Sequence, residues 1–104
     1  MSGDAEMLLR QRHILEEIEH GIRLANREVL NQVLPRMSRD HVLALAVAVA
    51  KLRGAYLAAA MRLVRPASAD LADLRARREA YDEARQAFEA LERAIERGYV
   101  ELKD

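Results

Sequence analysis

Apolar side chains recur with the period of an α-helix in three stretches of the chain. In residues 4–34 they lie three, four or seven positions apart, and in residues 68–97 they recur every seven positions. Such spacing places them on one face of a helix and is typical of a coiled-coil seam. The first stripe contains Leu8, Leu15, Ile18, Ile22, Ala25, Val29 and Val33, and the second contains Leu74, Tyr81, Phe88 and Ile95. Both stretches are predicted to be amphipathic helices.

The middle stretch, residues 39–64, is apolar around much more of its circumference. On a helical wheel with residues about 100° apart, its large apolar side chains cover about 220°. A helix on the outside of a bundle needs an apolar face of only roughly 100° or somewhat more. Neighbouring helices of the same chain cover part of this face, so a second copy is expected to cover the rest. The predicted interface residues are Leu45, Val49, Arg53, Tyr56, Leu57 and Met61.

Two proline-containing breaks separate the three helices. Pro35 disfavours helical geometry at the preceding residue. Ser38 then follows as a predicted N-cap, since a serine oxygen accepts hydrogen bonds from the free N–H groups of a first helical turn. Ser68 repeats this signal after Pro66. Both serines therefore predict the beginning of a helix.

The end of the third helix is predicted at Gly98, which suits the left-handed conformation of a C-cap. The remaining residues, 98–104, form a short tail with an alternating apolar pattern. Two conformations are open for this tail. It either continues the helix or adopts an extended form that docks on a partner.

The pattern as a whole predicts an all-α fold in one domain, residues 1–104, with helices over about 4–34, 39–64 and 68–97. Helices of this length span about 40–46 Å, whereas a compact globule of this size has a radius of gyration of about 13 Å. The expected architecture is therefore an elongated antiparallel three-helix bundle. Homodimerisation through the central helix is expected to complete it, because dimers are the commonest closed assembly.

Composition adds limits on function. The formal net charge is zero, which argues against a general nucleic-acid binder. Charge is uneven, however, at −2 for residues 1–34, +5 for residues 35–68 and −3 for residues 69–104. A basic helix between two acidic ones indicates either an internally neutralised bundle or a basic face for a partner. The chain has no cysteine, which excludes disulfides and thiolate metal sites.

No membrane span is expected from the apolar runs. The longest unbroken run begins at Val42 and has nine residues, whereas a membrane-spanning helix needs about 20. The longer stretch 42–64 is interrupted by Lys51, Arg53 and Arg62. The acidic N-terminal residues also lack the apolar core of a secretory signal. A cytoplasmic location is the corresponding expectation.

One constellation has the spacing of a metal site. His13, Glu17 and His20 lie at positions i, i+4 and i+7 of the first helix, so all three share one face. Two imidazoles and a carboxylate suit zinc or iron. That face lies opposite the apolar stripe, however, and no other helix carries a matching pair. The interpretation as a solvated charged face is therefore preferred, with metal binding as the alternative.

Arg53 is a second candidate because it lies within the apolar face of the middle helix. A charge in such a place needs a partner or a path for its head group to water. The preferred interpretation is a salt bridge to an acid of another helix or a second subunit. The alternative is a contact with an anionic ligand inside the bundle.

No motif points to catalysis. The chain has three serines, of which Ser38 and Ser68 are predicted caps, and its four glycines are too scattered for a phosphate-binding loop. The preferred hypothesis is a non-enzymatic helical interaction protein that acts as a homo-oligomer: an adaptor, a small regulatory subunit or a chaperone-like module. No cofactor is expected. The alternatives are a metal-binding or oxidative bundle, and a nucleic-acid-associated regulator whose phosphate contacts would be Arg36, Arg39, Arg62 and Arg65.

Overall fold

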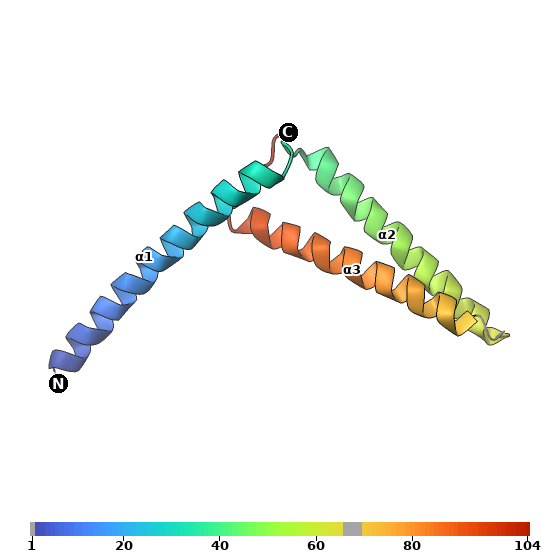
Figure 1. Ribbon diagram of the computed structural model, residues 1–104, viewed down its shortest axis with the longest axis horizontal. Coiled ribbons are helices and arrows are strands. Elements are labelled where there is room, and N and C mark those ends of the chain that lie inside the picture. The colour runs from blue at the N-terminus through green and yellow to red at the C-terminus, as the bar shows by residue number, and fades with distance from the viewer. Residues whose placement is uncertain (1, 66–69) are drawn as a thin grey trace.

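The computed structural model describes residues 2–65 and 70–104, and these residues are almost entirely helical. Helix α1 spans Ser2–Val33, helix α2 spans Arg39–Met61, and helix α3 spans Asp70–Glu96 (Figure 1). A single 3-10 turn, η1 (Arg62–Val64), extends α2. The prediction of an all-α fold is confirmed. The predicted cap Ser68 lies outside the described residues.

Helix α2 begins with a reciprocal pair of hydrogen bonds at Ser38. The Ser38 hydroxyl accepts the backbone N–H of His41 at 3.3 Å. In return, Nδ1 of the His41 ring accepts the backbone N–H of Ser38 at 3.0 Å. This is a capping box in which histidine takes the place usually held by Glu or Gln. The predicted N-cap is confirmed, and the His41 side chain is used to satisfy the backbone.

Helix α3 ends in the turn predicted from Gly98. This glycine has a φ of +75°, a left-handed conformation that costs little without a Cβ atom. The Gly98 N–H donates to the Ile95 carbonyl at 3.0 Å, and the Tyr99 N–H donates to the Ala94 carbonyl at 2.8 Å. These two bonds define a Schellman motif. The chain therefore leaves the helix axis at this point, and the tail is not helical.

Residues 98–104, named the tail strap here, run back to the joint between α1 and α2. The Lys103 N–H donates to the Met37 carbonyl at 2.8 Å, and the Arg39 N–H donates to the Lys103 carbonyl at 3.2 Å. Arg27 of α1 donates from Nε to the Gly98 carbonyl at 2.6 Å. The tail is therefore extended, and it docks on its own chain.

Helices α2 and α3 form an antiparallel hairpin. Phe88 lies beside Val49, Tyr81 lies at Arg53, and Asp73 pairs with Arg62, so the contacts run in opposite order along the two helices. The core of this hairpin is thin. Among the described residues only Val49 and Ala59 are buried, with exposed fractions of 7% and 1%.

Helix α1 extends away from the hairpin as a separate arm (Figure 1). Its backbone makes no close contact with α2 or α3. The molecule measures 71 × 40 × 18 Å and has a radius of gyration of 21.6 Å, well above the roughly 13 Å of a compact chain of this length. The bundle expected from the sequence, in which residues 4–34 pack beside the other two helices, is therefore not formed within one chain. The tail strap provides the physical reason, because it fixes the C-terminal end of α1 at the joint.

Candidate interaction surfaces

The inner face of the hairpin is held by an aromatic and cationic cluster. The Tyr56 and Tyr81 rings are stacked, with centroids 6.1 Å apart and an interplanar angle of 24°. Arg53 lies over the Tyr81 ring at 5.4 Å from its centroid, and its Nε donates to the Tyr81 hydroxyl at 3.1 Å. A cation over an aromatic face is attracted by the ring quadrupole. Within the described chain the partner of Arg53 is thus a tyrosine, and the predicted salt bridge to an acid of a second subunit stays a prediction.

A charged network closes the hairpin near η1. Asp73 of α3 pairs with Arg62 at 2.7 Å and with Arg77 at 3.3 Å. The hydrogen bond from Arg62 is the main cause that lowers the pKa of Asp73 below its ordinary value of 3.8, with Arg77 adding to it. The network is exposed to solvent, so it positions the helix ends rather than forming a buried site.

The six predicted interface residues divide between two faces of α2. Val49, Arg53 and Tyr56 face α3, so they lie in the intramolecular contact. Leu45 lies at the edge of that contact. Leu57 and Met61 point outward, with exposed fractions of 55% and 69%. Helix α3 therefore covers part of the wide apolar face, and the predicted contact of these six residues with a second copy stays a prediction.

The outward face of α2 carries a regular seam that the sequence reasoning did not isolate. Its members are spaced alternately four and three residues apart, which is the pattern of a coiled coil. We name this set the α2 outer seam: Leu43, Val47, Ala50, Gly54, Leu57 and Met61. All six residues are exposed. The alternation of fours and threes was available in the sequence, but the breadth of the apolar face concealed it.

A second unpartnered face lies on α1. The apolar stripe predicted for this helix is intact, and its large members are about half exposed, as for Ile18 at 50% and Ile22 at 49%. We name it the α1 stripe: Leu8, Leu15, Ile18, Ile22, Ala25, Val29 and Val33. The stability of helices in proteins comes mainly from packing of the apolar face. A stripe of this length without a packing partner is therefore a candidate binding surface.

The total surface supports the same interpretation. The chain exposes 8380 Å² to solvent. A compact monomer of 11.8 kDa is expected to expose about 5,900 Å². The excess is roughly 2,500 Å², and a typical protein–protein interface covers only about 800 Å² on each partner. The single chain therefore exposes enough surface for at least one interface.

Residues 39–64 also meet the requirements of a membrane-crossing helix by length and composition alone. Only 11% of the apolar window is buried in the described structure. The basic residues Lys51 and Arg53 lie near the middle of α2. Helix α3 lies along it and carries the ion-paired residues Asp82, Arg85 and Glu89. Those charges would have to enter the hydrocarbon together with α2, which is costly.

The candidate metal residues lie on the outside of α1. His13 Nε2 and Glu17 Oε1 are 2.9 Å apart, and the two side chains are 72% and 67% exposed. His20 is exposed as well. Within the described ranges 2–65 and 70–104, no group of three His, Cys, Asp or Glu residues is arranged to hold a metal ion. In the part of the chain that the structure describes, neither α2 nor α3 packs on α1 to bring further ligands to this face.

The four arginines considered for phosphate contacts do not form one patch. Arg36 and Arg39 lie at the beginning of α2, whereas Arg62 and Arg65 follow its end. The 23 residues of α2 separate the two pairs by about 35 Å. Arg62 is also engaged with Asp73.

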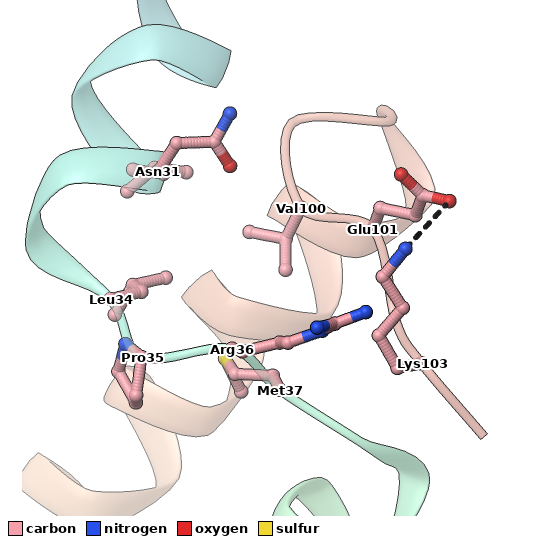
Figure 2. A pocket seen from close by; sticks show the side chains of 9 residues that line it. Asn31, Leu34, Pro35, Arg36, Met37, Val100, Glu101 and Lys103 are labelled. Atoms are coloured by element: carbon pink, nitrogen blue, oxygen red, sulfur yellow. Dashed lines mark ion pairs between the residues drawn. The ribbon is translucent and has the colours of Figure 1, made fainter.

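A hollow of about 280 Å³ lies where the tail strap meets the end of α1 (Figure 2). Its walls include Leu34 and Met37 from the joint and Val100 from the tail, and Figure 2 shows the Val100 side chain directed from the tail toward the end of α1. Lys103 and Glu101 form an ion pair within the tail at 3.7 Å. The hollow is open, and two of its charged lining residues, Glu101 and Lys103, are paired with each other. It therefore marks the attachment of the strap rather than a ligand site.

Comparison with known proteins gives no relative: no family model, no curated protein and no solved structure matches the chain.

Proposed function

We propose that this protein is a non-enzymatic helical interaction protein that acts as a homo-oligomer. The proposal places it among adaptors, small regulatory subunits or chaperone-like modules of the cytoplasm. The single observation that carries it is the presence of two fully formed helices whose regular apolar faces stay largely exposed in the described part of the chain. Apolar helix faces are common recognition elements, since they bury side chains at i, i+3, i+4 and i+7 against a partner.

A protein partner accounts for these faces better than a lipid bilayer does. Helix α3 contacts α2 along the inner face through Tyr81 and Asp73, so the hairpin would enter a membrane as a unit. The α2 outer seam lies on the side of the hairpin that faces away from α3. A one-sided seam with heptad spacing is the form expected of a helix that packs against another helix.

Size-exclusion chromatography with light scattering tests the proposal on the wild-type chain. We expect a mass that is a multiple of 11.8 kDa and that falls on dilution. The variant Leu57→Asp introduces a charge into the α2 outer seam and is expected to shift the mass toward the monomer. The matched variant Ala48→Asp, at an exposed position of the same helix outside the seam and its two flanks, is expected to keep the oligomer. A wild-type monomer at every concentration would refute the proposal.

A further inference from the structure

We propose that two copies of this chain exchange their α1 arms, so that the α1 stripe of each copy packs on the α2 outer seam of the other. This inference rests on the proposed homo-oligomer and names its geometry. In such a dimer, each hairpin receives its third helix from its partner. The three-helix arrangement indicated by the sequence is then completed between chains.

The direction of the α1 arm favours a partner in trans. Arg27 near the end of α1 is bonded to Gly98, and Met37 in the joint is bonded to Lys103. These contacts clamp the joint in the conformation in which α1 points away from its own hairpin (Figure 1). Folding α1 back onto its own α2 would require these bonds to break. A second copy meets both unpartnered faces without disturbing the tail strap.

The two faces complement each other in shape. The middle of the α2 outer seam consists of the small residues Ala50 and Gly54, and nothing lies within 4 Å of a Cβ atom placed on Gly54. The middle of the α1 stripe consists of the branched residues Ile18 and Ile22. Interiors are densely packed when large side chains oppose small ones. The branched side chains of α1 can therefore fill the depression along α2.

Charge distinguishes this pairing from a direct contact between two α2 helices. In the heptad register, Lys51 flanks one side of the α2 outer seam, whereas Arg53 on the other flank turns its head group to Tyr81 on the inner face. A second α2 helix would bring the Lys51 side chains of both copies to the interface. The acids Glu19 and Glu28 flank the α1 stripe, with Arg12 as the one base. Opposite charges across an interface select the partner and its orientation.

Length and symmetry are also satisfied. The α1 stripe from Leu8 to Val33 extends over about 38 Å and the α2 outer seam from Leu43 to Met61 over about 27 Å, so the arm covers the seam completely. Pairing of α1 with α1 would leave the α2 outer seam uncovered. Reciprocal exchange covers both faces in one closed two-fold assembly.

A mixing experiment with two variants tests the exchange. The arm variant carries Ile18→Asp and Ile22→Asp, and the seam variant carries Val47→Asp and Leu57→Asp. All four residues are exposed within a single chain, so the hairpin of each variant should stay folded, as circular dichroism will show. We expect each variant alone to be monomeric at concentrations where the wild type is dimeric. An equimolar mixture should regain a heterodimer in native mass spectrometry, because one intact arm still meets one intact seam.

Each other outcome overturns the exchange and identifies what replaces it. An arm variant that remains dimeric alone indicates pairing between α2 helices, and a seam variant that remains dimeric alone indicates pairing between α1 helices. A mixture without heterodimer also refutes the exchange. If the wild type is dimeric in that case, the proposed function survives, whereas a monomeric wild type removes both. The matched variant Leu24→Asp, which alters an exposed leucine off the stripe, should dimerise normally.

A charge exchange provides a second measurement that leaves the apolar faces unchanged. Lys51→Glu and Glu19→Lys are each expected to weaken the dimer, by roughly two- to fivefold in the dissociation constant for exposed flanking charges. The double variant that carries both changes should recover most of this loss. Equal weakening in the double variant would show that these two side chains do not meet, and would contradict the proposed pairing.

Discussion

The hairpin and the α1 arm are built from the same kind of sequence, yet only one of them has a partner. Helix α3 and helix α1 both carry an apolar stripe of heptad character. The stripe of α3 meets the inner face of α2, where Tyr81 stacks on Tyr56 and binds Arg53. No described helix packs along the stripe of α1, whose large side chains remain about half exposed. The heptad pattern therefore specifies that a helix will be paired, but not which chain supplies the partner.

The largest expected difference in stability is between variants of a buried valine in the hairpin and of an exposed valine in the α1 arm. Val49→Asp places an unpaired charge in the hairpin core and should destabilise the hairpin by about 3 kcal/mol. Val29→Asp makes the same change on the α1 stripe, where the valine is exposed in the single chain. It should leave hairpin unfolding unchanged and reduce only the dimer content. Urea unfolding of both variants under dilute conditions measures the difference, and equal losses would show that α1 is part of the hairpin core.

The second-largest difference is expected between a glycine of the tail strap and a glycine of the α1 arm. Gly98→Ala puts a Cβ atom on a residue with a φ of +75°, which should cost about 1–2 kcal/mol. Gly21→Ala changes a glycine in the middle of α1, with open space around it. That change should favour the helix by roughly 0.5–1 kcal/mol. Thermal unfolding followed by circular dichroism compares them, and a stabilising Gly98→Ala would contradict the Schellman turn.

Much of the local structure could be predicted from single residues. Ser38 and Gly98 act as caps because their chemistry fits only the end of a helix: a hydroxyl that accepts N–H groups, and a backbone free to take a positive φ. The helical stripes followed from spacing alone. These features depend on neighbours within a few positions, which the sequence contains in full.

The arrangement of the helices and the candidate surfaces could not be predicted in the same way. The width of the apolar face of α2 indicated more apolar surface than one chain can cover. It did not indicate that Val49 and Tyr56 turn toward α3, or that Leu57 and Met61 turn outward. The tail strap depends on hydrogen bonds between residues more than 60 positions apart, Lys103 and Met37. The alternating pattern of residues 98–104 allowed an extended tail, but backbone groups carry no residue-specific signal, so the sequence did not indicate that the tail binds the joint of its own chain. The direction of α1 follows from it.

A smaller loss of stability is expected from changes at Ser38, the N-cap of α2, which lies at the joint between the α1 arm and the hairpin. Ser38→Ala removes the acceptor for the His41 N–H and should destabilise the hairpin by about 1 kcal/mol. Ser38→Gly should cost only a few tenths of a kcal/mol, because glycine is tolerated at this position. Chemical denaturation of both variants gives the comparison. Equal costs for the two variants would show that the hydroxyl does not cap α2.

The smallest effect is expected from the exposed network at the closed end of the hairpin. The Arg62 hydrogen bond lowers the pKa of Asp73 below 3.8 in the folded chain. A carboxyl with a depressed pKa in the folded state stabilises it at pH values above the unfolded pKa, and this stabilisation is lost as the pH falls through the folded value. The melting temperature of the wild type should therefore exceed that of Asp73→Asn by a constant, small amount at neutral and mildly acidic pH. Below about pH 3.8 the difference should shrink toward zero.

The matched variant Asp40→Asn serves as the control. It alters an exposed acid on the other helix, for which no such ion pair is present among the described residues. A difference for Asp73→Asn that persists unchanged in strong acid would mean that its carboxylate does not hold the ends of α2 and α3 together.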